Sequence, residues 1–182
     1  ARLEELFIQR SSVPSARGGD TLHICIASDQ ALPNLILTQV PDLKPSVVII
    51  LSSQRMEIAA GRLRYGLLKS GFTESQVHLY ADMPDQDMDA IVSYGDALIQ
   101  RLRSDFPGHR WVLNATGGTK PMASGLMQAL RPYADMLYCD TAHDHIEVLH
   151  PPGRPSRKLP VDLINLEKYL AVQGFVVREE GD

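Results

Sequence analysis

Several features that would place this chain in a special class of protein are scarce or missing. Only two cysteines are present, Cys25 and Cys139, and neither has a Cys or His at zinc-binding spacing, so we expect buried thiols in a reducing, cytoplasmic compartment. No uninterrupted apolar stretch is longer than a handful of residues, as in 47–51, which predicts no membrane span and no signal-peptide core. The 18 Lys and Arg are outnumbered by 22 Asp and Glu, a formal net charge of −4 that argues against a broad surface for DNA or RNA.

The remaining composition is that of an ordinary globular chain. Apolar residues make up 44% and charged residues 22% of the 182 residues, enough for one domain with a sizeable core. Apolar residues at helical spacing and then a Ser/Gly/Pro/Arg-rich stretch predict an N-terminal helix and linker over 1–20. A regular alternation of short apolar runs and amphipathic stretches predicts one domain over 21–150. Residues 151–182 begin as a Pro-rich link, form a short amphipathic helix and end as another apolar run begins, so we expect a fragment of a longer protein.

Short apolar or β-branched runs alternate with amphipathic helical stretches along the predicted domain. The expected helices include 56–67, 88–102 and 121–130, and the expected strands are 23–27, 46–51, 77–81, 111–114, 136–140 and 145–149. Apolar strands that alternate with helices predict an α/β, Rossmann-like, mostly parallel sheet of about six strands with helices on both faces. The last two strands are joined by only four residues, so they should form an antiparallel hairpin at the C-terminal edge of the sheet.

The segments that follow the predicted strands carry the candidate ligand-binding residues, because ligands of open parallel sheets bind beyond the carboxyl ends of the strands. After the first strand these are Ser28, Asp29, Gln30, Leu32, Pro33 and Asn34, all expected in a loop; after the second, Ser52, Ser53, Gln54 and the adjacent Arg55; after the third, Asp82.

The loop after the fourth predicted strand is the strongest signal in the sequence. It reads Asn114-Ala115-Thr116-Gly117-Gly118-Thr119-Lys120 and leads into the predicted helix, whose first turn carries Met122. Glycines expose backbone N–H groups, the helix N-terminus contributes a positive dipole end, and threonine and lysine add further donors, so the loop predicts a site for phosphate or another anion. The Gly spacing matches neither a Walker A loop nor the GxGxxG fingerprint. A tight strand-to-helix turn alone would also explain the two glycines, and core or dimer packing would also explain Met122.

Two weaker patterns contain possible metal ligands. His143, Asp144 and His145 lie in the predicted hairpin, where a solvated turn is the simpler interpretation. Asp82, Asp85, Asp87 and Asp89 could hold a cation, but acidic residues at the start of a helix are favoured by its dipole. We therefore expect neither a metal nor a cofactor.

The segment from Asn114 to Lys120 resembles the signature loop of CARF domains, the CRISPR-associated Rossmann-fold sensors of type III CRISPR ancillary effectors. Residues 28–34 resemble the first ligand loop of the CRISPR ancillary nuclease branch, and 162–175 resemble its connection to an effector domain, so the resemblance spans about 21–175. It implies a domain that binds a cyclic oligoadenylate, usually cyclic tetra-adenylate, across a homodimer and activates a fused C-terminal effector without binding DNA itself.

The resemblance also implies roles for individual residues. Lys120 and the N–H groups of 117–119 would neutralise phosphates, Ser28 and Asn114 would orient ribose or phosphate oxygens, and the other loops would accept adenine edges. No catalytic residue is assigned. A metal-independent ring nuclease is the alternative, although these loops contain no histidine to act as a general base. A Rossmann-type nucleotide-binding enzyme is a further alternative that the missing glycines after the first strand disfavour.

Overall fold

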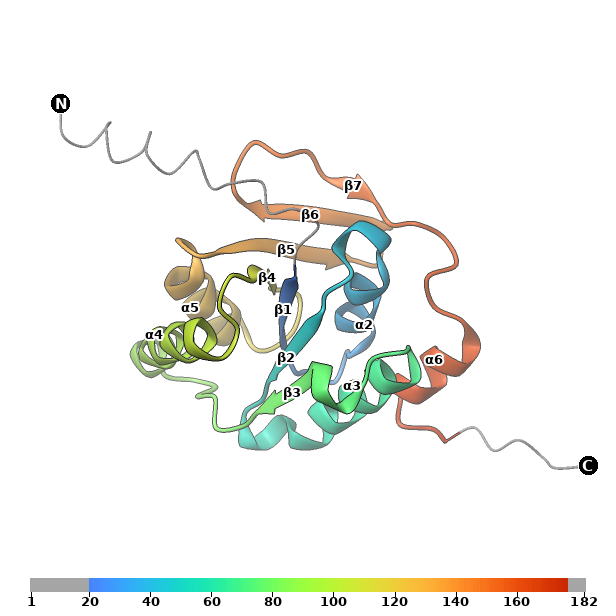
Figure 1. Ribbon diagram of the computed structural model, residues 1–182, viewed down its shortest axis with the longest axis horizontal. Helices are drawn as coiled ribbons and strands as arrows, with labels where there is room; N and C mark the ends of the chain where they lie inside the picture. The colour runs from blue at the N-terminus through green and yellow to red at the C-terminus, as the bar shows by residue number, and fades with distance from the viewer. Residues whose placement is uncertain (1–19, 177–182) are drawn as a thin grey trace, which may run out of the picture.

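The computed structural model describes residues 20–176, which form one seven-stranded sheet in the order β3-β2-β1-β4-β5-β6-β7 (Figure 1). The five strands from β3 to β5 in this order are parallel, and β6 and β7 are antiparallel to their neighbours. The strands are β1 (Thr21–Ile26), β2 (Val47–Leu51), β3 (Val77–Tyr80), β4 (Arg110–Asn114), β5 (Ala134–Asp140), β6 (His145–His150) and β7 (Arg157–Lys158).

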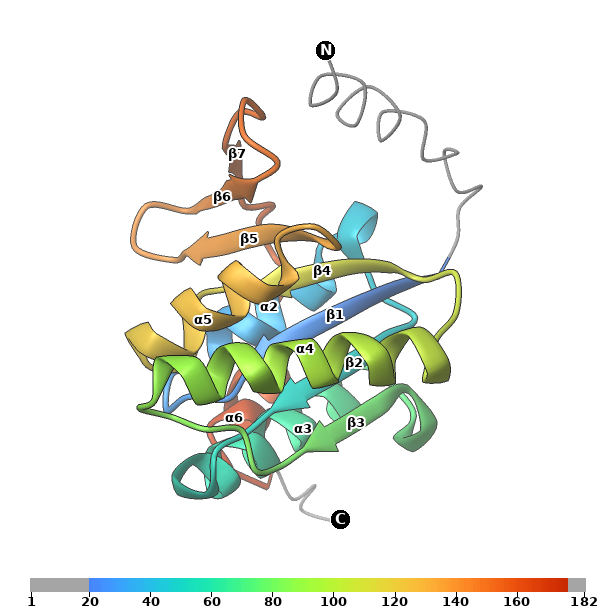
Figure 2. The same cartoon turned by 90° about the vertical axis from the view of Figure 1, so that its left-hand side faces the viewer.

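Helices cover both faces of the sheet, as Figures 1 and 2 show. On one face lie α4 (Met88–Asp105) and α5 (Lys120–Leu130), and on the other lie α2 (Leu32–Gln39), α3 (Glu57–Lys69) and α6 (Leu166–Val172). Three single turns of 3₁₀ helix complete the described elements: η1 (Pro41–Leu43), η2 (Gln54–Met56) and η3 (Glu74–Gln76). Within residues 20–176, no helix is long and apolar enough to cross a membrane.

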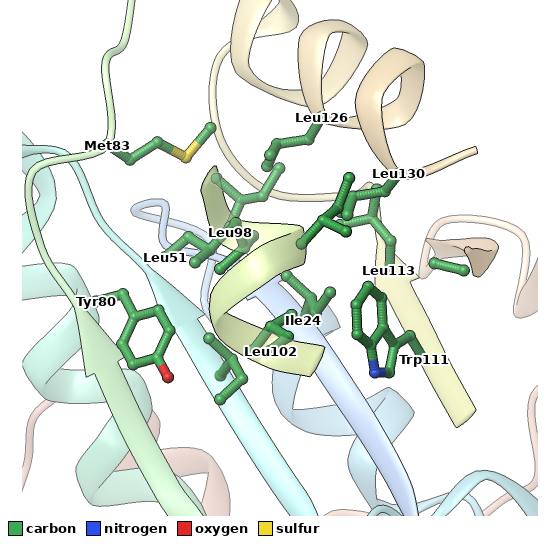
Figure 3. Close-up of a cluster of buried hydrophobic side chains, with 14 of the residues drawn as sticks. Ile24, Leu51, Tyr80, Met83, Leu98, Leu102, Trp111, Leu113, Leu126 and Leu130 are labelled. Carbon is green, nitrogen blue, oxygen red and sulfur yellow. The ribbon is translucent and has the colours of Figure 1, made fainter. Parts of the chain in front are cut away.

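The largest core cluster lies between the sheet and the α4–α5 pair (Figure 3). Ile24 and Leu113 project from the sheet and meet Leu98 of α4 and Leu126 of α5, all of them almost fully buried. Gly95 of α4 and Gly125 of α5 allow these helices to approach closely. A Cβ on Gly95 would lie 2.5 Å from the Cβ of Ala129. Burial of this apolar surface is the main contribution to the stability of the fold. The close packing also fixes where α5 lies against the sheet, and therefore where its N-terminus lies.

The predicted fold class is confirmed, with one correction to the edge of the sheet. The six predicted strands and the three bounded helices are present within a few residues of their expected positions. The expected β5–β6 hairpin forms, but β6 is not the edge strand, because β7 pairs with it. Sequence reasoning missed β7, since it consists of two charged residues, Arg157 and Lys158, inside a segment interpreted as a Pro-rich link.

The predicted segments on either side of the domain lie partly outside the residues that the structure describes. The predicted N-terminal helix and linker lie outside the described residues, except for Asp20. At the other end α6, within the segment predicted as a link and helix over 151–182, packs against α3. Gly66 of α3 leaves the space for this contact, because a Cβ there would lie 2.9 Å from the Cβ of Val172.

Candidate functional site

A cavity of about 330 Å³ opens at the carboxyl edge of the sheet, where the strand order reverses. β1 and β4 are neighbours, but the helix after β1 covers one face and the helix after β4 covers the other, so the segments that follow the two strands turn to opposite faces of the sheet. Such a crevice is the usual binding position in open α/β sheets. The cavity is lined by Ala27, Ser28, Asp29, Gln30, Ser53, Arg55, Met56, Asp85, Thr116, Gly118, Thr119 and Met122.

Many of the residues expected to bind ligand therefore share one cavity. The ones that line it are Ser28, Asp29, Gln30, Ser53, Arg55, Thr116, Gly118, Thr119 and Met122. The expected residues that are not part of its wall are Leu32, Pro33, Asn34, Ser52, Gln54, Asp82, Asn114, Gly117 and Lys120. Ala27, Met56 and Asp85 line the cavity without having been expected. The sequence predicts Ala27 and Met56 as strand and helix residues and Asp85 as a helix-start charge, so only their place within a few residues after a strand end could have indicated the site.

The segment after β1 is shorter as a loop than expected. Leu32, Pro33 and Asn34 belong to the first turn of α2, where Pro33 is pre-organised for the helix and both Pro33 and Asn34 are buried. The loop that faces the cavity is thus 28–30, and the Ser28 hydroxyl donates to the carbonyl of Gln30 at 3.2 Å.

The amide side chain of Asn114 is fully engaged inside the protein. Its Nδ2 donates to Asn34 Oδ1 at 2.8 Å and to the carbonyl of Pro33 at 3.3 Å, while its Oδ1 accepts from both the N–H and the hydroxyl of Thr116. Asn34 Nδ2 in turn donates to the carbonyl of Ile26 at 2.9 Å. We call these two residues the asparagine pair. It holds the 114–120 loop to the end of β1, so in this structure Asn34 and Asn114 support the cavity rather than face it.

Thr116 extends this network to the next strand. Its Oγ1 accepts from the N–H of Cys139 in β5 at 2.8 Å, while it donates to Asn114. Because Thr116 also lines the cavity, the wall of the site is hydrogen-bonded to β1, β4 and β5 together. A buried network in which each member has its partners fixes a single geometry.

The two glycines of the loop have separate structural reasons. A Cβ on Gly117 would lie 2.1 Å from the carbonyl oxygen of Ile26, so this position must be glycine for the loop to approach β1. Gly118 has φ +78°, a left-handed conformation that favours glycine. Both glycines allow the turn, as the simpler interpretation held, and the turn also brings the N-terminus of α5 to the cavity.

Thr119 is the N-cap of α5 and ties a third loop to the site. Its Oγ1 accepts from the N–H of Met122 at 3.3 Å and donates to the carbonyl of Asp85 at 3.0 Å. The Thr119 hydroxyl, which the sequence predicts as a donor to a ligand, donates in this structure to the Asp85 carbonyl. Lys120 follows as the first, exposed residue of the helix, and Met122 is buried in the core beneath it.

The charges around the cavity are mixed. Arg55 in η2 is 72% exposed, and its guanidinium lies 4.0 Å from the carboxylate of Asp85. Asp29 is exposed on the opposite loop. The positive end of α5 and Arg55 favour anionic groups, whereas the carboxylates of Asp29 and Asp85 accept hydrogen bonds from amino or hydroxyl groups. The cavity suits a ligand that carries both phosphate and N–H or O–H groups.

The weaker patterns have structural explanations. Asp87 is the N-cap of α4 and accepts from the N–H groups of Asp89 and Ala90. His143 lies in the exposed hairpin turn, where its hydrogen bond to Asp140 raises the pKa of its imidazole. Between residues 20 and 176, no group of three or more His, Cys, Asp or Glu side chains could hold a metal ion.

The two cysteines are buried free thiols, as expected from their apolar surroundings. Burial raises the pKa of Cys25 to about 12, and burial followed by the charge of Asp140 does the same for Cys139. Both side chains therefore remain protonated thiols at neutral pH.

Comparisons with known proteins match most of the chain. The family model described as the Card1 CARF domain matches residues 22–169. Can2 from Sulfobacillus thermosulfidooxidans, solved in complex with cyclic tetra-adenylate, is 26% identical with a TM-score of 0.66, over 84% of this chain and 40% of that one. The chain thus spans about 40% of the length of Can2.

Two further structures share the fold. Protein VC1899 from Vibrio cholerae is 17% identical with a TM-score of 0.73, over 84% of this chain and 39% of that chain. A type III CRISPR defence DNA nuclease activated by cyclic oligoadenylate is 23% identical with a TM-score of 0.67, over 89% and 24%. No curated protein sequence matches the chain. Because the family match covers most of its length, the chain belongs to the Card1 CARF domain family.

Proposed function

We propose that this chain senses a cyclic oligoadenylate, with cyclic tetra-adenylate as its ligand. The observation that carries the proposal is the meeting of the α5 N-terminus with three further loops in one cavity at the strand-order reversal. The helix end, with Lys120 beside it, provides an anion site for a ring phosphate. Asp29, Gln30 and Asp85 offer acceptors to adenine N–H or ribose O–H groups. The similarity to Can2, which was solved with this ring, supports the same ligand.

We further propose that two copies of the chain share one ring. The cavity, about 330 Å³, lies at the small end of the usual range for small-molecule sites, about 300–1,000 Å³, and a ring of four nucleotides exceeds it. Two identical cavities related by a two-fold axis would match the symmetry of the ring. Ile58 and Met88 are exposed apolar side chains at the starts of α3 and α4, beside the cavity loops, and provide apolar surface for such a dimer near α5. A fused C-terminal effector domain would then respond to closure of the pair.

A panel of rings tests this function. Calorimetric titration with cyclic tri-, tetra- and hexa-adenylate is expected to show tightest binding for the tetra-adenylate, with one ring bound per two chains. Linear tetra-adenylate serves as the control and should bind more weakly, because it must lose conformational freedom on binding. A monomer by light scattering at saturating ring, or one ring bound per chain, would contradict the shared site.

The same samples test for ring cleavage. None of the described residues that line the cavity is a histidine, the side chain that most often acts as a general acid or base, and its only carboxylates are those of Asp29 and Asp85. General acid–base catalysis contributes about 10²–10⁴-fold to rates, so without a histidine we expect the ring to be recovered intact or cleaved slowly, without a requirement for metal. Several turnovers per minute, or linear products that form only with added Mg²⁺ or Mn²⁺, would favour the ring-nuclease function instead.

Lys120→Ala is expected to weaken ring binding without unfolding the protein. Its ammonium is exposed at the start of α5, and loss of one charge-assisted hydrogen bond to phosphate costs about 1.5–3 kcal/mol. Wild-type affinity should also fall as KCl is raised, and this salt dependence should be smaller for the variant. Lys69→Ala is the matched control, since Lys69 is an exposed lysine in the last turn of α3. An equal effect of both substitutions would mean that Lys120 does not contact phosphate.

A further inference from the structure

A second cavity, of about 350 Å³, lies at the amino-terminal edge of the sheet, at the opposite end of the strands from the candidate site. Arg110 and Asp135 stand at the starts of β4 and β5, Asp42 belongs to η1, Arg157 is in β7, and Arg154 lies in the segment before it. We call this space the arginine cavity. Its apolar wall consists mainly of Val112, Leu137 and Val148 from β4, β5 and β6.

The arginine cavity is positively charged although the chain is negative overall. Three guanidinium groups face two carboxylates, a surplus of one positive charge in a protein whose formal net charge is −4. Arg157 is paired with Asp42, and this hydrogen bond holds the pKa of the Asp42 carboxyl below its usual value. The pair uses one arginine and one carboxylate, which leaves Arg110 and Arg154 to share Asp135.

That sharing is unequal. Arg110 donates from Nε to Asp135 Oδ2 at 3.1 Å and also from Nη2 to the same oxygen. Arg154 Nη1 is 3.8 Å from this oxygen, beyond hydrogen-bond distance, and its side chain is 56% exposed. A guanidinium carries five N–H donors in a planar fork that matches phosphate or carboxylate oxygens. Arg154 therefore offers a fork of donors beside an oxygen that Arg110 already occupies.

His23, a buried residue beneath the cavity, adds no positive charge of its own. His23 pairs in register with Val112 of the cavity wall and is fully buried. Burial, and then the positive charge of Arg110, lower the pKa of His23 to about 3. Its imidazole is neutral at pH 7, so the charge of the site comes from the arginines at its rim, and the base of the site is uncharged.

We propose that the arginine cavity binds a small organic phosphate. Its phosphate group would lie beside Arg154 and would accept hydrogen bonds from Arg154 and from the N–H donors of Arg110 and Arg157 that their partners, Asp135 and Asp42, leave unused. Its apolar or planar body would rest on Val112, Leu137 and Val148. A volume near 350 Å³ suits a small molecule. The proposal is independent of the cyclic oligoadenylate site, because the two cavities have no lining residue in common.

Methyl NMR of the whole chain tests the site with two probes, inorganic phosphate and phenyl phosphate, in 150 mM KCl. We expect saturable shifts of the Val112, Leu137 and Val148 methyl groups, and tighter binding of phenyl phosphate because of its apolar ring. Binding of inorganic phosphate with no gain from the ring would reject an organic ligand. The absence of a saturable shift with either probe would overturn the proposal altogether.

Substitution of Arg154, the arginine that lies beyond hydrogen-bond distance of Asp135, provides the second test. Arg154→Ala should weaken phenyl phosphate binding at least tenfold, and Arg154→Lys should restore little, since an ammonium lacks the planar fork. Arg131→Ala is the matched control, because Arg131 is an exposed arginine after α5 that does not line the cavity. Unchanged affinity in Arg154→Ala would contradict the assignment. Lys120→Ala should leave phenyl phosphate binding intact, which separates this site from the ring site.

Discussion

Replacement of Gly117 by alanine is expected to abolish most of the ring affinity, on the order of a hundredfold or about 2.8 kcal/mol. The added Cβ would lie 2.1 Å from the carbonyl oxygen of Ile26 and 3.1 Å from Asn34 Nδ2. The clash is with backbone, which cannot rotate away, so the 114–120 loop must move off the end of β1. Thr116 and Gly118, which line the cavity, would move with it.

Stability should fall together with binding in Gly117→Ala. Overpacking of a well-packed position costs about 1–3 kcal/mol, and each kcal/mol lowers Tm by about 2–4 °C in a domain of this size. Gly61→Ala is the control for the substitution itself. A Cβ at Gly61, which is exposed in α3, would meet no described atom within 4 Å beyond its chain neighbours and the nearby backbone of its own helix, so that variant should gain about 0.5–1 kcal/mol of stability and bind normally. Normal ring affinity in Gly117→Ala would show that the loop position is unimportant for binding.

The architecture was predictable because the sequence pattern and the packing depend on the same residues. Apolar runs such as 47–51 are buried on both sides, which a parallel sheet between two helical layers requires. The exceptions have local causes. β7 has no apolar pattern to detect, and the start of α2 lies within a polar-flanked segment that reads as a loop until Pro33 is recognised as a first-turn residue.

The site was predictable as a region but not as a set of contacts. The loops after the strands were identified because parallel strands bring their carboxyl ends to one edge. Whether a polar side chain faces the cavity or the core depends on partners far away in sequence. Asn114 is hydrogen-bonded to Asn34, 80 residues earlier, and Thr119 is hydrogen-bonded to the backbone of Asp85. Sequence reasoning therefore assigned both asparagines to the ligand, while the structure places them behind the loop.

Asn34→Ala is expected to reduce both stability and ring affinity by acting through the loop. The substitution removes the donor to the Ile26 carbonyl and the acceptor of Asn114 Nδ2, both buried. A buried polar group left without its partner costs about 1–3 kcal/mol. Asn114 would then be released from β1, and Thr116, which bonds to its Oδ1, would lose its fixed position on the cavity wall.

Two comparisons separate this positioning role from a general loss of packing. Thr38→Val is the matched control in the same helix, since Thr38 is buried but donates only locally, to the carbonyl of Leu35 at 2.7 Å. It should alter urea stability modestly and leave ring affinity unchanged, whereas Asn34→Ala should weaken the ring at least tenfold. In a double-mutant cycle, Asn34→Ala and Asn114→Ala should be non-additive by about 0.5–3 kcal/mol in stability, as expected for residues in one network. A destabilised Asn34→Ala that binds the ring as tightly as the wild type would mean that the asparagine pair stabilises the fold without setting the geometry of the site.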